Sequence, residues 1–255
     1  MNSVKKGIKA AIANEAVDIE TLMLERKLNA LFRLPRDNAE ERKGLHASAI
    51  IVSDSAFCIR EQVLSLFYKR NEEENISDGL LRIFAEGNSI HEKWQSMFKR
   101  AGIARAIEDR GYSKMFDLYM TPDAVVEINN KLYVVEIKSA NTYSYKSMKD
   151  SHPAGTKQLQ LYMHFLCIPR GFVLVEDKNT QEFKVFVTKY EPGQAAPFVK
   201  RLYDISEAKE NFLKNNTLPK RICKSIGCTR ASRCAMSNAC FGISRKRLEK
   251  NIKKF

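Results

Sequence analysis

Residues 121–139, TPDAVVEINNKLYVVEIKS, decide how this chain folds, because they have the composition of a β-hairpin. Val, Ile and Tyr favour strands on both sides of a central Asn129-Asn130 pair. Asparagine tolerates positive φ, so this pair predicts a two-residue turn. In the register that such a turn sets, Asp123 lies directly opposite Glu136, with Cβ atoms roughly 5 Å apart.

Charged side chains gather on one face of this hairpin. Lys138 points to the same face as Glu136, since side chains alternate along a strand. Two adjacent carboxylates repel each other unless a proton or a cation lies between them, and Mg²⁺ is the usual cation. Lys138 would then orient or deprotonate an attacking water, or neutralise developing charge. The pattern therefore predicts a metal site for phosphate chemistry.

The alternative for the same pattern is a solvated face with a surface ion pair, which contributes little to stability. The surrounding residues argue against this alternative. Val134, Val135 and Ile137 make the second strand apolar on both faces. Glu136 and Lys138 are therefore expected to enter a largely buried sheet, where charges need partners.

Pro122-Asp123 followed by Glu136-Ile137-Lys138 resembles the signature of the PD-(D/E)xK nucleases, in their RecB-like branch. The resemblance implies that Asp123 and Glu136, helped by the Ile137 carbonyl, hold Mg²⁺ or Mn²⁺. It also implies that Lys138 assists the water that hydrolyses the phosphodiester. Asp123, Glu136 and Lys138 are thus the expected catalytic residues.

Apolar residues at spacings of three and four predict an amphipathic helix from Ser77 to Arg100. His91 lies on its apolar stripe, between Gly87 and Trp94. A lone histidine in such a place is usually a hydrogen-bonded core residue. The run GNSIH, however, resembles the helical histidine motif that precedes the acidic hairpin in RecB-like nucleases. That resemblance implies that His91 is a further ligand of the Mg²⁺ or Mn²⁺ ion.

A second helix is expected to begin near Thr156. Gln158 and Tyr162 are four residues apart in it and lie on one helical face. The simple interpretation is an amphipathic helix whose tyrosine covers the core. The Gln-x-x-x-Tyr spacing after Glu-x-Lys also resembles the fourth RecB-family motif. This resemblance implies that both side chains position the DNA strand at the metal site.

The chain has six cysteines. It contains no apolar run of roughly 18 residues, so no membrane span is predicted, and its N-terminus lacks the apolar core of a signal peptide. We therefore expect a reducing cytoplasm, where cysteines are thiols or metal ligands; the resemblance to RecB-like nucleases implies a bacterial or phage-infected cell. Cys167 is better explained as a core residue. Four others lie close together in the tail: Cys223, Cys228, Cys234 and Cys240.

Four cysteines can hold Zn²⁺ tetrahedrally or an iron–sulfur cluster. The chain resembles a RecB-like subgroup in which one cysteine before the nuclease core and three after it hold a [4Fe-4S] cluster. CRISPR-associated exonucleases, the AddB nuclease domain and phage exonucleases belong to that subgroup. The resemblance implies a cluster on Cys58, Cys223, Cys234 and Cys240, with Cys228 as the alternative tail ligand and Zn²⁺ as the alternative metal.

The net charge is +13, and residues 220–255 carry eleven Lys or Arg residues against one acid. A basic tail is either a solvated chain end or a surface for a polyanion. Next to a nuclease-like site it favours DNA as the partner. We expect phosphate contacts from Arg230, Arg233, Arg245 and Lys246.

Apolar runs over residues 171–175 and 183–187, with a polar linker between them, predict a second hairpin, and a further helix is expected over 195–215. This order predicts an α/β fold with a mixed β-sheet flanked by helices, and the resemblance implies a restriction-endonuclease-like core. The expected regions are a helical N-terminal extension (1–44), the nuclease core (45–218) and a cysteine-rich basic segment (219–255).

Together these features imply a metal-dependent DNA nuclease. The resemblance suggests an exonuclease that hydrolyses phosphodiester bonds at single-stranded or frayed DNA ends, in recombination, repair or phage genome processing. The chain has no Gly-x4-Gly-Lys motif, so such a nuclease would act without its own ATP motor. A recombination or replication protein is a further expected partner. The alternative is a non-catalytic zinc or iron–sulfur DNA-binding or assembly factor, which would bind DNA without turnover.

Overall fold

The computed structural model describes residues 22–24, 26–32, 44–68 and 77–242. The chain divides into two compact units, one of Met1–Glu41 with Glu74–Asn88 and the other of Arg42–Glu73 with Ser89–Phe255. In the first unit, residues 22–24 and 26–31 are helical. The rest of the predicted N-terminal extension lies outside the described residues, as do Arg245 and Lys246 of the tail.

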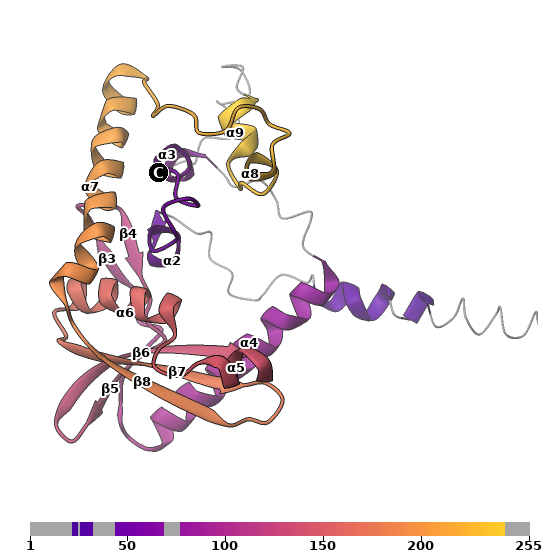
Figure 1. Ribbon diagram of the computed structural model, residues 1–255, viewed down its shortest axis with the longest axis vertical. Coiled ribbons are helices and arrows are strands. Elements are labelled where there is room, and N and C mark those ends of the chain that lie inside the picture. Colours follow the sequence, from indigo (N-terminus) through magenta and orange to yellow (C-terminus); the bar gives the residue numbers. More distant parts are fainter. Residues whose placement is uncertain (1–21, 25, 33–43, 69–76, 243–255) are drawn as a thin grey trace, which may run out of the picture. The chain divides into compact units, whose positions relative to one another are not determined.

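Five strands form the main sheet of the second unit: β2 (Ala104–Ile107), β5 (Ala124–Ile128), β6 (Lys131–Ala140), β7 (Arg170–Asp177) and β8 (Phe183–Lys189). Their order in the sheet is β2-β5-β6-β7-β8; Figure 1 labels β5 to β8 of this sheet. β6 and β7 are parallel to each other, and the other neighbours are antiparallel. The two parallel strands carry runs of Val, Ile and Leu because both of their faces are buried.

A second, smaller sheet has three short strands: β1 (Leu45–His46), β3 (Gly111–Ser113) and β4 (Leu118–Met120). β4 lies in the middle, parallel to β1 and antiparallel to β3. This sheet joins the first described residues of the second unit to the segment that precedes the hairpin. Two sheets of this kind with flanking helices confirm the predicted mixed α/β class.

Helices cover both faces of the main sheet. α6 (Pro153–Leu166) packs on one face, in a core that includes Val173. α4 (Asp78–Arg100) contributes Phe98 to a second core on the opposite face, together with Ile137. The other helices are α2 (Ala47–Ile50), α3 (Ile59–Phe67), α5 (Thr142–Ser147), α7 (Pro192–Asn215), α8 (Thr229–Ser232) and α9 (Ser237–Phe241). Among the described residues, none of the helices has the length and apolarity needed to cross a bilayer.

The hairpin of β5 and β6 has the predicted register. Ala124 pairs with Val135, and the turn residues Asn129 and Asn130 have φ angles of 51° and 57°. Both therefore adopt the left-handed conformation that a two-residue turn requires. The same register, continued by one residue, places Asp123 opposite Glu136. This is the predicted arrangement of the two acids.

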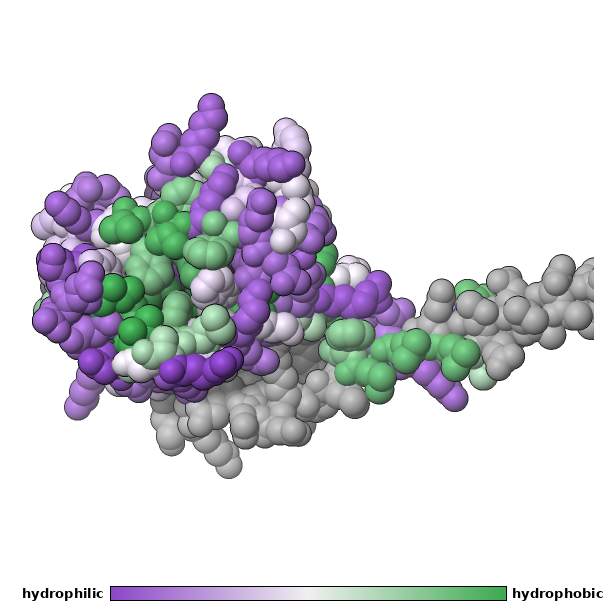
Figure 2. Space-filling model, turned by 90° about the horizontal axis from the view of Figure 1, so that it is seen from below, coloured by the Kyte–Doolittle hydropathy of each residue, from purple (hydrophilic) through white to green (hydrophobic). Residues whose placement is uncertain are grey.

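β8 is an edge strand whose apolar side chains remain at the surface. Phe183, Val185 and Val187 alternate along it and are 53%, 44% and 68% exposed, whereas Leu174, the β7 partner of Val185, is buried. Hydrophobic residues are visible at the surface when the molecule is viewed from below (Figure 2). The apolar face of the sheet therefore extends beyond the part that the helices cover.

Gly155, in the first turn of α6, allows this helix to lie close to the sheet. A Cβ at this position would lie 2.9 Å and 3.0 Å from the two methyl carbons of Val173, the residue next to Glu136 in the sheet. We expect Gly155→Ala to destabilise the fold by about 1–3 kcal/mol, because overpacking forces the helix away from the sheet. Thermal unfolding should show this as a lower Tm.

Gly193 provides the matched control, since it lies in the first turn of α7, a helix that also begins with a proline. A Cβ at Gly193 would meet no atom within 4 Å. Gly193→Ala is therefore expected to leave Tm unchanged or to raise it slightly, because alanine favours helices. Equal Tm values for the Gly155 variant and the wild type would contradict the close contact with Val173.

Two arginines hold the loop of residues 50–57, which leads into α3. Arg201, a buried residue of α7, donates to two backbone carbonyls of this loop and to Asp54 Oδ1, the latter at 2.5 Å. Arg230, from the tail, donates to three further carbonyls of the same loop. These contacts give the guanidinium of Arg230 a role in holding the loop, and the expected phosphate contact of Arg230 stays a prediction.

Candidate active site

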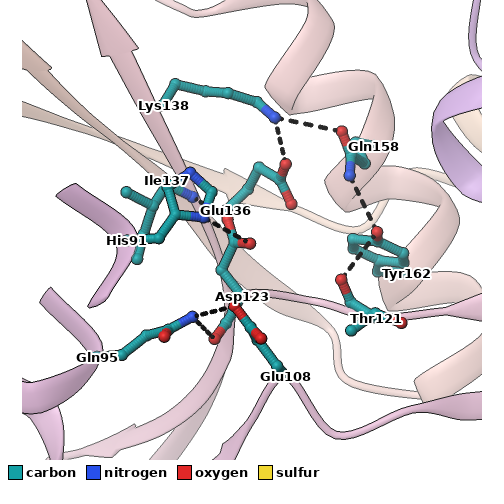
Figure 3. A network of polar contacts seen from close by, with 10 residues as sticks. All are labelled: His91, Gln95, Glu108, Thr121, Asp123, Glu136, Ile137, Lys138, Gln158 and Tyr162. Carbon is teal, nitrogen blue, oxygen red and sulfur yellow. Dashed lines mark hydrogen bonds and ion pairs between the residues drawn. The ribbon is translucent and has the colours of Figure 1, made fainter. Parts of the chain in front are cut away.

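Glu136 and Lys138 project from β6 toward α6, and Asp123 lies immediately before β5 (Figure 3). Glu136 is only 2% exposed, and its Oε1 accepts a hydrogen bond from Lys138 Nζ. Its Oε2 is also buried, and no hydrogen-bond donor contacts this atom within the part of the chain that the structure describes. A buried carboxylate oxygen without a partner is costly, so this atom is the best candidate ligand for a cation.

Asp123 is held by contacts on three sides. Its Oδ2 accepts the backbone N–H of Ile137 at 2.6 Å, and its carbonyl oxygen accepts a hydrogen bond from Gln95 Nε2 at 3.1 Å. The second carboxylate oxygen, Oδ1, lies 3.2 Å from His91 Nδ1. Because the strand fixes Oδ2, Oδ1 is the oxygen that can face either His91 or a cation.

Burial and the neighbouring charges shift the pKa values of Glu136 and His91. Burial, followed by repulsion from Asp123, raises the pKa of Glu136 to about 8 despite the attraction of Lys138. Burial lowers the pKa of His91, but the hydrogen bond and the charge of Asp123 outweigh burial, so that its pKa is raised. In the metal-free protein a proton on Glu136 therefore relieves the repulsion that a cation would otherwise relieve.

Gln158 and Tyr162 lie side by side on α6, and Gln158 lies next to Lys138 of β6. Gln158 Oε1 is 3.5 Å from Lys138 Nζ, and Gln158 Nε2 donates to the Tyr162 hydroxyl at 2.9 Å. The hydroxyl donates in turn to the Thr121 carbonyl at 3.1 Å. Burial raises the pKa of Tyr162, so the hydroxyl stays protonated. A chain of contacts thus joins Lys138 to the segment that precedes Asp123 (Figure 3).

The donor set determines which metal could bind here. In the described residues no three His, Cys, Asp or Glu side chains stand in an arrangement that could hold a metal ion. Asp123 and Glu136 nevertheless present carboxylates, one with an unpaired buried oxygen, and His91 faces them. Oxygen donors of this kind suit a hard cation such as Mg²⁺ or Mn²⁺, which takes few protein ligands and keeps several waters.

Gln95 and Glu108 belong to this network, although the sequence did not identify them. Gln95 Nε2 donates to Glu108 Oε1 at 2.9 Å as well as to the Asp123 carbonyl. Gln95 could have been found, since it follows His91 by one turn on the same helical face. Glu108 reaches the network through a left-handed backbone with φ 46°, and no local sequence signal points to it.

A second candidate site is a cavity with four cysteines in its lining: Cys58, Cys223, Cys234 and Cys240. Cys58 is the N-cap residue of α3, and the other three come from the tail. Arg60 donates to Cys240 Sγ at 3.2 Å and to the Pro219 carbonyl at 2.8 Å. Cys228 is not among the residues that line this cavity; its Sγ accepts the N–H of Ala231 at 3.4 Å at the start of α8.

Cys167 was expected in the core, and that expectation is wrong. Its side chain is exposed, because α6 ends at Leu166 and Cys167 adopts a left-handed C-cap conformation with φ 54°. The apolar periodicity of the helix therefore stops one residue before this cysteine.

Solved structures similar to this chain include the crystal structure of SSO0001, with a TM-score of 0.46 and 16% identity over 88% of this chain and 96% of that chain. An alkaline exonuclease from Laribacter hongkongensis, LHK-Exo, has a TM-score of 0.48 and 16% identity over 68% of this chain and 92% of that chain. LHK-Exo in complex with dAMP has a TM-score of 0.47 and 15% identity over the same shares. No protein-family model matches the chain, and no curated protein matches it.

Proposed function

We propose that this chain is a metal-dependent nuclease that hydrolyses DNA. One observation carries the proposal: the buried Glu136 carboxylate lies beside Lys138 and keeps one oxygen without a hydrogen-bond partner among the described residues. Burying such a group is costly, and a cation is the partner that would offset the cost. Asp123 and Glu136 would hold Mg²⁺ or Mn²⁺, with His91 and the Ile137 carbonyl as further ligands. The ion would act as a Lewis acid and activate the phosphate for attack.

The surrounding side chains have separate roles in the proposed hydrolysis. The oxygen of a water molecule forms a bond to phosphorus while the bond from phosphorus to the leaving sugar oxygen breaks; the water releases a proton to solvent, and the leaving oxygen takes one up from solvent. Lys138 orients this water and offsets negative charge that develops on the phosphate. Gln158 and Tyr162, which are held together and anchored to the Thr121 carbonyl, position the strand beside it.

The proposed substrate is a single-stranded or frayed DNA end, and the proposed mode is exonucleolytic. The net charge of +13 supports a polyanionic substrate. The Gln-x-x-x-Tyr resemblance supports DNA as that polyanion. The division into an N-terminal extension, a nuclease core and a basic cysteine-rich segment belongs to the same proposal.

Degradation assays with the purified full chain test this function. The substrates are end-labelled linear single-stranded DNA, linear duplex with frayed ends and circular single-stranded DNA, each with Mn²⁺, with Mg²⁺ and with EDTA. We expect linear strands to be degraded only with a divalent cation and circles to persist. Cleavage of circular DNA would show that the enzyme is an endonuclease and would contradict the exonuclease mode. If the protein binds DNA in a salt-sensitive way but does not degrade it, the proposed nuclease activity is wrong, and the alternative of a non-catalytic DNA-binding factor is supported.

For the cysteine-lined cavity we propose a structural metal centre, a [4Fe-4S] cluster with Zn²⁺ as the alternative. Its support is that Cys58 and Cys223, which are 165 positions apart in the sequence, line the same cavity with Cys234 and Cys240. Four cysteine thiolates suit either group chemically; because the described side chains do not stand in a metal-binding arrangement, binding would have to bring the four sulfur atoms together. Anaerobically purified protein should be brown and contain iron and sulfide, whereas colourless protein with stoichiometric zinc would refute the cluster.

Cys58→Ser is expected to lower Tm strongly, because binding of a structural metal is coupled to folding. The matched control is Cys167→Ser, which changes an exposed cysteine outside the cavity. Differential scanning fluorimetry with metal analysis of the same samples measures both effects. If the Cys58 variant keeps its metal content and its Tm, the proposed metal centre does not include this residue.

A further inference from the structure

Glu176, in β7, is a buried acid that the proposed chemistry does not use. It is 2% exposed and lies on the face of the sheet that α4 covers. Its Oε1 accepts a hydrogen bond from Lys93 Nζ at 2.5 Å, and its Oε2 accepts one from Trp94 Nε1 at 2.6 Å. The Trp94 ring also packs edge-on against Phe183, with centroids 4.9 Å apart. We call Glu176, Lys93 and Trp94 the α4 clamp.

Stability alone is a weak explanation of this clamp. Removing a carboxylate from water costs several kcal/mol, and an apolar residue of similar volume often serves as well. The side chain of Lys93 is 43% exposed, so this lysine could find an acid at the surface at a lower cost. What the clamp provides is geometry, because two consecutive helix residues bind the two oxygens of one carboxylate. This fixes both the rotation of α4 and its position along its axis.

The position of α4 matters for His91. This histidine lies one helical turn before Trp94, on the same side of the helix, and its Nδ1 is 3.2 Å from Asp123 Oδ1. Glu176 is paired in the sheet with Ser139, the residue that follows Lys138 in β6. The clamp therefore connects the helix that carries His91 to the strand next to the one that carries Glu136. A rotation or shift of α4 would move His91 relative to both acids.

We infer that Glu176 is a positioning residue: through Lys93 and Trp94 it sets where His91 stands relative to Asp123 and Glu136, and thereby the affinity of the site for a divalent cation. This inference rests on the proposed function, in which His91 is a metal ligand. Two contacts would then hold α4 in place, through helix residues that follow His91. Gln95 holds α4 to the Asp123 carbonyl, and Glu176 holds the same helix to β7.

The test measures Mn²⁺ binding to the full chain without DNA, by electron paramagnetic resonance of the free ion. Glu176→Gln keeps the shape of the side chain but removes its charge and one of its two acceptor oxygens. We expect the dissociation constant for Mn²⁺ to rise about tenfold, the size of effect typical of residues that orient a metal ligand. Glu127→Gln is the matched control, since it breaks an ion pair of 2.8 Å with Arg105 in the same sheet and should leave the constant unchanged.

A double-mutant cycle separates positioning from general stabilisation. In a His91→Ala background, Glu176→Gln should no longer weaken Mn²⁺ binding, although its effect on Tm should persist. Equal weakening in both backgrounds, or none in either, would overturn the inference. Wild-type protein that binds no Mn²⁺ would overturn the proposed function instead. Trp94→Phe serves if the Glu176 variant does not fold, because it removes the N–H that Glu176 Oε2 accepts while it keeps an aromatic ring at this position, and it should weaken binding in the same His91-dependent way.

Discussion

Glu136→Gln is expected to slow DNA degradation roughly a thousandfold or more, the scale of loss seen when one essential polar group of an active site is removed. The amide has the shape of the carboxylate and can still accept a hydrogen bond from Lys138. It is, however, neutral and a poor ligand for a hard cation. The substitution should therefore remove cation binding while it leaves the fold and the DNA-binding surface intact.

Single-turnover cleavage of labelled single-stranded DNA at saturating Mg²⁺ measures this loss, and gel-shift titration in EDTA measures DNA binding separately. Glu127→Gln is the control for a change from acid to amide in the neighbouring strand. Lys138→Met should cause a comparable loss, since it removes the group that orients the water. Undiminished Mg²⁺-dependent cleavage by both the Glu136 and the Lys138 variants would refute the assignment of the active site.

The same Glu136→Gln substitution is expected to stabilise the metal-free protein at pH 8 and above. The pKa of Glu136 is raised from 4.5 to about 8 in the fold, so the folded state binds a proton that the unfolded state releases. The stability that this proton provides is fully present below pH 4.5 and is lost as the pH rises through about 8. Glutamine resembles the protonated form at every pH, so its contribution does not vary.

Urea unfolding in EDTA at several pH values tests this second effect. Between pH 5 and pH 9 the wild type should lose free energy of unfolding on the order of 2–4 kcal/mol relative to the glutamine variant. Addition of Mn²⁺ at pH 8 should then stabilise the wild type and not the variant, because only the wild type binds the ion in its folded state. Parallel pH profiles for the two proteins would show that Glu136 does not carry the raised pKa.

Several parts of the site could be predicted because local chemistry determines them. The Asn129-Asn130 turn fixes which residues of β5 and β6 face one another, since the register of a hairpin follows from its turn. The spacing of Gln158 and Tyr162 places them on one face of any helix, whatever that helix packs against. Burial of Glu136 followed in the same way from the apolar residues on either side of it.

Other parts depend on contacts between distant segments, which no local pattern contains. Glu176 stood at the start of a run that was expected to be a polar linker, yet β7 continues through Asp177 and Glu176 is buried. Its burial is possible only because Lys93 and Trp94 approach from another element more than eighty positions away. The carbonyl partners of Arg230, at residues 55–57, likewise could not be predicted from the sequence. In each case the partner, and not the residue itself, was unpredictable.

The hold of Arg201 and Arg230 on the 50–57 loop has a consequence for the newly made chain. The carbonyls of this loop leave the ribosome 151 and 175 residues before these arginines, a delay of roughly 8 to 35 s at ordinary rates of synthesis. The candidate active site lies within the part made during this wait. A chain that stops before the tail would contain Arg201 and every proposed catalytic side chain but not Arg230, so the carbonyls of residues 55–57 would lack the donors that hold them, and this part of the loop would be exposed to proteases.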